Sequence, residues 1–219
     1  MTQPGYKQYI IDNIHRFPFG LPIYTNDIAN GFAWQFEVDV KEAKALVNVY
    51  LKRIADNGDL KRYCKGIYYR AQETPFGETR LNPAHIISDT YLQKNGVVIG
   101  YETGASFLNR IGLTTQIAKY KHYATNAFKQ NGSRVDRKLN VVIRKPPVTV
   151  TEENHRYLQL LDAIANKDHV PIDAHHPETF FLDYIRKNGL DFAKLVAYGS
   201  KYYKREMLLR IGEIAASEL

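Results

Sequence analysis

Apolar residues recur at three- and four-residue spacing near the amino terminus, which predicts helices. The first such segment predicts a helix over residues 5–16, ended by Pro18. We expect a short second helix that Thr25 caps and Gly31 ends, because a threonine hydroxyl can accept from the free backbone amides of a first turn. A third and stronger pattern follows these two.

This third pattern covers residues 39–56 and runs to Gly58. It opens with Asp39 and, three residues later, Glu42, a pairing typical of a helix amino terminus. Its apolar stripe consists of Ala43, Leu46, Val47, Tyr50, Leu51 and Ile54. Its other face carries Lys41, Lys44, Asn48 and Lys52. The pattern predicts an amphipathic helix with a basic outer face.

A basic, aromatic hairpin is predicted next, with arms at 60–64 and 67–70 and a Lys65-Gly66 turn. Three helices followed by such a hairpin is the order of elements in a winged helix-turn-helix. In that fold the third helix enters the DNA major groove and the hairpin lies along the DNA backbone. Residues 41–70 hold eight basic residues and three acidic ones, which favours this interpretation.

The order of elements in a winged helix-turn-helix also predicts which residues contact DNA. Lysines mostly hold phosphates, whereas an exposed asparagine amide can read an adenine edge through two hydrogen bonds. The predicted set is Lys41, Lys44, Asn48 and Lys52 of the helix and Arg62, Lys65 and Arg70 of the hairpin. Two alternatives stay open: a basic face that is merely solvated, and a winged-helix module that binds protein without binding DNA.

The sequence Pro75-Phe76-Gly77 predicts a boundary between domains 1–75 and 76–219. Asn82 and Pro83 then predict the cap and the first residue of a helix, since proline at that position loses no helical hydrogen bond. The first domain is the winged helix-turn-helix, and the second is larger.

Strand and helix patterns are mixed in this second domain. Apolar runs predict strands at 97–101 and 139–143, with a short helix over 105–111. From Thr151 onward the patterns are helical, at about 158–165, 177–188 with Gly189 as a carboxyl-terminal cap, 190–198 and 200–216. The predicted fold class is therefore α+β and helix-rich, with an N-terminal winged helix-turn-helix followed by a larger α+β domain.

The formal net charge of +7 is distributed unevenly along the chain. It is +2 over residues 1–75, +7 over 76–150 and −2 over 151–219. The positive charge of residues 1–150 favours a polyanion partner. The negative charge of residues 151–219 favours a surface that binds something else.

Three segments carry a family resemblance: the helix-and-hairpin stretch that ends Lys65-Gly66-Ile67-Tyr68, GYETG at 100–104, and GLTTQ at 112–116, ahead of Thr125-Asn126. In this order they resemble the AbiE-type antitoxins of bacterial type IV toxin–antitoxin (abortive infection) systems and related bacterial winged-helix proteins. The resemblance covers nearly the whole chain. It implies an autorepressor that binds its own operator as double-stranded DNA, and a C-terminal domain that opposes a nucleotidyltransferase-like toxin.

Catalytic and metal sites are not predicted. A polar cluster consists of Asp173, His175, His176, Glu178 and Asp183. No HExxH or paired-cysteine spacing accompanies it, so solvated side chains are expected. A small hydrolase or nucleotide-processing enzyme that uses this cluster is the least favoured function. The glycines of 100–104 lack the Lys-Ser/Thr pair of a phosphate loop, which favours helix–strand packing. We expect a protein that is not an enzyme and needs no cofactor.

Cys64 is the only cysteine, so an intrachain disulfide is impossible, as expected of a reducing compartment. No apolar run approaches the roughly 20 residues that span a bilayer, and the first residues lack the pattern of a secretory signal. We expect a cytoplasmic protein with no membrane partner.

Overall fold

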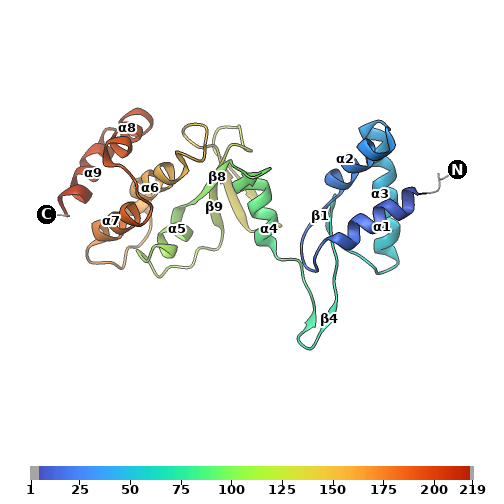
Figure 1. Ribbon diagram of the computed structural model, residues 1–219. Coiled ribbons are helices and arrows are strands. Elements are labelled where there is room, and N and C mark those ends of the chain that lie inside the picture. Colours follow the sequence, from blue (N-terminus) through green and yellow to red (C-terminus); the bar gives the residue numbers. More distant parts are fainter. Residues whose placement is uncertain (1–4, 218–219) are drawn as a thin grey trace. The chain divides into compact units, whose positions relative to one another are not determined.

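The computed structural model describes residues 5–217 and shows an α+β protein in two compact units (Figure 1). Unit 1 is Met1–Ile86 and unit 2 is Ile87–Leu219. The predicted α+β class is confirmed at this level. The division falls after Ile86, later in the chain than the predicted boundary at 75/76.

Unit 1 opens with three helices and a small antiparallel sheet. In chain order the elements are α1 (Tyr6–Arg16), β1 (Ile23–Tyr24), α2 (Thr25–Phe36), α3 (Val40–Asp56), β2 (Lys61–Cys64) and β3 (Ile67–Tyr69). The strand order is β1-β3-β2, so the last strand lies between the other two. The helices predicted at 5–16 and 39–56 and the hairpin that follows them are confirmed.

Packing against α1 explains why the second helix differs from its prediction. Thr25 does not cap α2: it is the first helical residue, and its buried hydroxyl has no hydrogen-bond partner. Gly31 does not end the helix, which continues to Phe36. A methyl group at position 31 would lie 2.7 Å from the Tyr9 hydroxyl oxygen of α1. Gly31 therefore allows the close approach of two helices, and the predicted cap and break are both wrong.

A second hairpin, formed by β4 (Glu73–Thr74) and β5 (Gly77–Glu78), projects from the body of unit 1 (Figure 1). Phe76 at its tip is fully exposed. Lys61 of β2 binds Glu78 at 2.9 Å, and the Arg70 carbonyl accepts from the Gly20 backbone N–H at 2.9 Å. These contacts tie the segment after β3 to β2 and to the turn between α1 and β1, which is why the unit extends beyond residue 75.

Unit 2 contains a four-stranded mixed sheet. The elements before its last helices are α4 (Pro83–Ile87, which begins in unit 1), the π-helical turn η1 (Ser88–Leu92), β6 (Gln93–Lys94), β7 (Val97–Val98), β8 (Gly100–Thr103), α5 (Gly104–Arg110), β9 (Lys121–Thr125), β10 (Ser133–Asp136) and β11 (Val141–Arg144). The sheet order is β10-β11-β9-β8, and only the β9–β11 pair is parallel.

Two features of this region differ from the sequence prediction. The strand predicted at 97–101 is divided at Ile99 into β7, which forms a small hairpin with β6, and β8, which is an edge of the main sheet. Strands β6, β9 and β10 were not predicted, although β9 and β10 belong to the main sheet. The Asn82 side chain does accept from the Ala84 backbone N–H at 2.9 Å, as expected of the cap before Pro83.

The last part of unit 2 is helical. Its elements are α6 (His155–Asn166), the 3-10 turn η2 (Lys167–His169), α7 (Pro177–Lys187), α8 (Phe192–Tyr202) and α9 (Glu206–Ala216). The predicted break near residue 199 is wrong, because Gly199 lies inside α8 and the helices separate at 203–205. Gly199 is buried against Met207 and Ile211 of α9, so here too a glycine marks a close contact.

Helix α6 lies between the sheet and the other C-terminal helices and is buried over eight consecutive residues, 157–164. Leu158 packs with Tyr101 and Ala124 of the sheet, whereas Leu161 belongs to the core shared with α7, α8 and α9. Because both sides of the helix are covered, its two buried polar side chains must find partners inside the protein.

The Asp162 carboxylate of α6 is one of these polar groups. It accepts from the Tyr101 hydroxyl of β8 at 2.8 Å, from the Tyr203 hydroxyl at 2.8 Å, and from the Arg144 guanidinium of β11. Tyr101, Ala124 and Arg144 are partners in register across three strands. The small Ala124 lies between the two larger side chains, which both reach Asp162.

Burial raises the pKa of the Asp162 carboxyl, and the Arg144 guanidinium and the two phenols oppose that rise. Burial also raises the phenol pKa of Tyr101 and of Tyr203, and the nearby carboxylate adds to both shifts. Both tyrosines therefore keep their protons at neutral pH and serve as donors.

Asp173 holds the loop after α5. Its carboxylate accepts from the backbone N–H of Thr115 at 2.6 Å and from the Thr115 hydroxyl at 2.8 Å. The Thr114 hydroxyl accepts from the Gln116 backbone N–H at 3.1 Å. The Thr114 and Thr115 side chains of the GLTTQ segment thus take part in a structural hydrogen-bond network.

Asp162→Asn is expected to lower the free energy of unfolding of unit 2 by about 3 kcal/mol, because it leaves the Arg144 charge without its buried partner. Asp168→Asn is the matched control. Asp168 pairs with Arg210 but its side chain is 56% exposed, so we expect a loss of at most about 1 kcal/mol. Urea unfolding followed by far-UV circular dichroism measures both, and equal losses would contradict the role given to Asp162.

The hydrogen bonds from Thr115, first the backbone one and then that of the hydroxyl, lower the pKa of the Asp173 carboxyl. A lowered folded-state pKa means that this contact stabilises the fold above the unfolded-state pKa of about 3.9 and is lost as pH falls through the folded value. Thr115→Ala should move the Asp173 midpoint upward in a carboxyl-detected NMR titration. Thr179→Ala, which removes a hydroxyl bound to the His176 carbonyl instead, should leave it unchanged.

Candidate nucleic-acid interface

One face of α3 carries the predicted contact residues and is open to solvent. Lys41, Lys44, Asn48 and Lys52 are all exposed. At 100° per residue their directions fall within an arc of about 80°. Ala43, Val47 and Leu51 are buried and hold the helix to the core of unit 1. The four side chains are thus brought together on one stripe of the helix.

The start of α3 is fixed by its cap. The Asp39 carboxylate accepts from the backbone N–H groups of Lys41 at 2.8 Å and of Glu42 at 3.4 Å. This satisfies two of the free amides of the first turn and fixes the direction in which Lys41 leaves the helix. The Asp39-x-x-Glu42 pattern therefore located the amino terminus correctly.

The β2–β3 hairpin presents two more of the predicted residues, Arg62 and Lys65, both exposed. Gly66 adopts a φ of 81°, a left-handed conformation that glycine allows in a tight turn. Its carbonyl accepts from the Thr25 backbone N–H at 2.9 Å, which fixes the hairpin turn at the start of α2. The hairpin is consequently short and anchored at its turn.

The Arg70 side chain forms hydrogen bonds with the end of α1. One amino group of its guanidinium donates to the carbonyl oxygens of His15 and Phe17, each at 3.0 Å. The guanidinium also lies over the Phe19 ring, 4.2 Å from its centroid. A cation at the carboxyl end of α1 is favourable because that end carries partial negative charge. Arg70 therefore has a structural role, and we do not include it in the proposed contact surface.

Exposed apolar residues in unit 1 were not singled out from the sequence. Trp34, the only tryptophan, is 83% exposed on α2, and Val49 is exposed on α3 beside Asn48. The signal that could have found Trp34 was the helical period, because position 34 lies on the side of α2 opposite the buried Ile28 and Phe32. An exposed tryptophan is a candidate protein contact, because aromatic side chains are enriched at protein interfaces.

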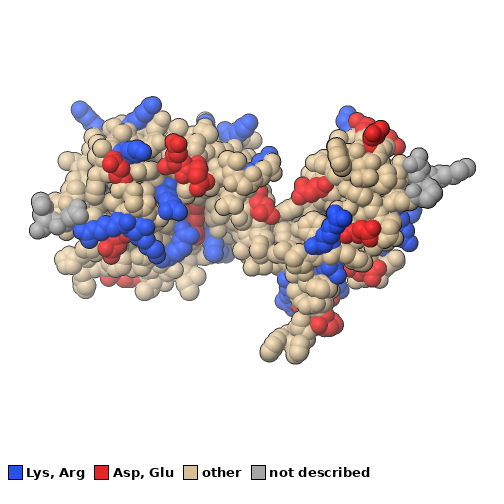
Figure 2. All heavy atoms as spheres, viewed as in Figure 1, with Lys and Arg blue, Asp and Glu red and all other residues tan. Residues whose placement is uncertain are grey.

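Three arginines of the basic middle of the sequence are engaged in contacts within unit 2. Arg144 binds Asp162, Arg110 binds Glu102 at 3.1 Å, and Arg134 lies over the Phe128 ring at 5.6 Å from its centroid. Figure 2 shows acidic and basic side chains interspersed on the face of each unit that is in view. The exposed face of α3 is therefore the better-defined candidate.

The polar cluster of residues 173–183 does not converge. Asp173 binds Thr115, and Glu178 binds Lys167 at 3.5 Å. His175 and His176 are exposed. Among the residues that the structure describes, no group of three or more His, Cys, Asp or Glu side chains could hold a metal ion. Asp173 and Glu178 thus form contacts within unit 2.

The glycine segment at 100–104 serves packing. A methyl group at position 100 would lie 2.1 Å from the carbonyl oxygen of Tyr91 and 2.7 Å from that of Ala124. Only glycine fits between η1 and β9 at this point, in agreement with the helix–strand packing inferred from the sequence.

Within residues 5–217, no helix is both long and apolar enough to cross a membrane. Comparison with known proteins adds no assignment: no protein-family model matches the chain, and no curated protein matches its sequence.

Proposed function

We propose that unit 1 is a winged helix that binds double-stranded DNA and represses the operon that encodes this protein. The element order α1-β1-α2-α3-β2-β3 and the strand order β1-β3-β2 support it. In a winged helix the third helix enters the major groove and the hairpin follows the backbone. The observation that carries the proposal is the exposed stripe of three lysines and one asparagine on that third helix.

Each residue of the surface then has a chemical role. Lys41, Lys44 and Lys52 neutralise phosphates and set the orientation of the helix. Asn48 lies between Lys44 and Lys52 on the stripe, where its amide can donate to and accept from an adenine edge. Arg62 and Lys65 of the hairpin contact the adjoining backbone.

We further propose that unit 2 supplies the antitoxin activity, opposing a nucleotidyltransferase-like toxin. The support is the resemblance of GYETG and GLTTQ to AbiE-type antitoxins. In the structure these two segments flank one helix: the first forms β8 and begins α5, and the second follows the end of α5. They therefore belong to a single continuous part of unit 2.

A winged-helix module that binds protein and not DNA is the second candidate. The exposure of Trp34 and Val49 favours it, because both lie in unit 1 and neither is explained by phosphate contacts. In this case the lysines of α3 would be a solvated face, and the purified protein would not shift its promoter DNA even at low salt.

The DNA proposal predicts a strong salt dependence. The logarithm of affinity for promoter duplex should fall linearly with the logarithm of salt concentration, with a slope of about −0.9 for each phosphate contact. Lys52→Gln should reduce that slope by about 1 and weaken binding to operator and unrelated duplex alike. Lys7→Gln, an exposed lysine of α1, is the matched control and should change neither.

Asn48→Ala tests base reading in the same titration. It should lower discrimination between operator and unrelated duplex by about 1–3 kcal/mol while leaving the salt slope unchanged. If Asn48→Ala and Lys52→Gln weaken binding equally on both duplexes, Asn48 holds the backbone and does not read bases.

The two proposed activities should separate in the full-length chain. A Lys44→Gln, Lys52→Gln double variant is expected to lose repression of a promoter reporter but still to protect cells that express the toxin encoded beside it. Colony counts and reporter output in one strain measure both, with Lys7→Gln as the control. Loss of protection in the double variant, with its circular dichroism unchanged, would contradict the assignment of antitoxin activity to unit 2.

A further inference from the structure

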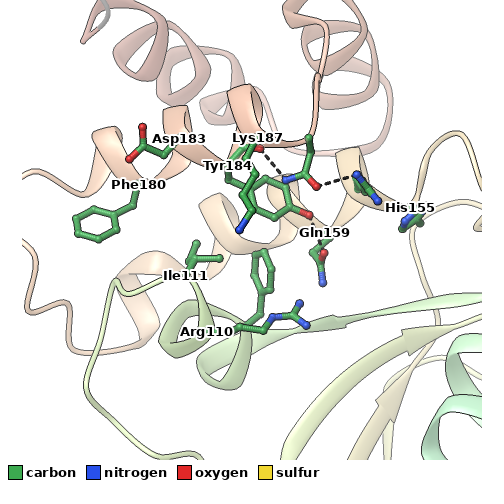
Figure 3. A pocket seen from close by; sticks show the side chains of 11 residues that line it. Arg110, Ile111, His155, Gln159, Phe180, Asp183, Tyr184 and Lys187 are labelled. Carbon is green, nitrogen blue, oxygen red and sulfur yellow. Dashed lines mark hydrogen bonds between the residues drawn. The ribbon is translucent and has the colours of Figure 1, made fainter.

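Unit 2 contains a cavity of about 580 Å³ between α5, α6 and α7 (Figure 3). This size lies in the range of sites that hold small molecules, about 300–1,000 Å³. Tyr184 and Lys187 of α7 extend toward the end of α5 (Figure 3). The Gln159 side chain of α6 meets the Tyr184 hydroxyl.

The floor of the cavity is aromatic, and its polar groups are already paired. Phe107 is buried, and its ring meets the Tyr184 ring edge to face at a centroid distance of 5.5 Å. The Tyr184 hydroxyl donates to Gln159 Oε1 at 2.8 Å, and Gln159 Nε2 donates to the Glu102 carbonyl at 2.7 Å. A ligand that enters the cavity meets the half-buried Tyr184 ring, against which a flat aromatic group fits.

The rim is cationic. Arg110, Arg156 and Lys187 line the cavity, against a single carboxylate, Asp183. Figure 3 places Asp183 at the Phe180 end, away from Arg110. Arg110 also pairs with Glu102, which does not line the cavity. These charges favour an anion at the rim.

The guanidinium groups keep donors free for such an anion. Arg156 donates through one amino group to Asn188 Oδ1 at 2.9 Å, which orients its side chain and leaves its other N–H groups. Lys187 has no ion-pair partner among the described residues. Burial raises the pKa of the Tyr184 phenol, and the positive charges of Arg110 and Arg156 oppose that rise, so both charges act on the cavity floor.

The wall opposite α6 depends on a glycine. Gly112 has a φ of 85°, and a methyl group there would lie 3.1 Å from the Phe180 ring. The ring therefore lies against the turn after α5, and the wall of the cavity is built from packed side chains.

We propose that this cavity binds an aromatic phosphomonoester of mononucleotide size, with its ring system against the Tyr184 ring and its phosphate at Arg110, Arg156 and Lys187. A phosphomonoester carries close to two negative charges at pH 7, and the planar guanidinium fork matches its oxygens. Every base has a flat π-face, so stacking on an aromatic ring holds the base without selecting it. The ligand is either a free nucleotide or the 5′-terminal nucleotide of a strand.

Isothermal titration of the full-length protein with AMP and UMP tests the proposal. Both should bind saturably and within several-fold of each other, whereas adenosine and inorganic phosphate should each bind at least ten-fold more weakly. A single-stranded tetranucleotide with and without a 5′-phosphate distinguishes the two sources. If the 5′-phosphorylated tetranucleotide binds more tightly than both AMP and the unphosphorylated strand, the site takes strand ends. If it does not, the site takes free nucleotides.

Lys187→Gln and Arg156→Gln should each weaken AMP binding at least ten-fold. Lys194→Gln, an exposed lysine of α8 outside the cavity, should leave it unchanged. All three are surface substitutions, and circular dichroism checks that they fold. The proposal is overturned if AMP shows no saturable binding at millimolar concentration, if inorganic phosphate binds as tightly as AMP, or if Lys187→Gln and Lys194→Gln behave alike. None of these outcomes bears on DNA binding by unit 1.

Discussion

The buried Asp162 carboxylate of unit 2 needs hydrogen-bond donors, and these come from three different parts of the chain. The way in which α6, the sheet and the last helices meet depends on that need. Asp162 gathers a tyrosine from one edge strand, an arginine from β11 and a tyrosine from the turn between α8 and α9. Replacing such a cluster by apolar residues can be neutral for stability, whereas losing one member is costly. The cluster thus fixes the orientation of α6 on the sheet.

The neighbouring Gln159 extends the same constraint toward α7. Its amide bridges the backbone of β8 and the Tyr184 hydroxyl, so sheet, central helix and α7 are joined by polar contacts within one turn of α6. Leu158 and Leu161 supply the apolar contacts on either side. The position of α7, and with it the shape of the cavity at its base, consequently depends on α6 being held against the sheet.

Local patterns predicted much of unit 1 but less of unit 2. Helix α3 was predictable because its cap and its apolar stripe both lie within the helix itself, and its exposed stripe followed from the same periodicity. Strand β9 was missed because its pairing with β11 is parallel and distant in sequence. Gly31 and Gly199 were taken as helix ends because the side chains that approach them belong to other helices. Arg70 was assigned to DNA for the same reason, as its carbonyl partners lie more than fifty residues away.

The placement of Trp34 also determines what spectroscopy can see in this protein. The only tryptophan lies on the surface of unit 1, whereas unit 2 contains none. An exposed indole is already in water, so its emission changes little when the chain unfolds, and melting of unit 2 leaves it unaffected. Tryptophan fluorescence is therefore a reporter of what touches α2, and a poor measure of folding for either unit.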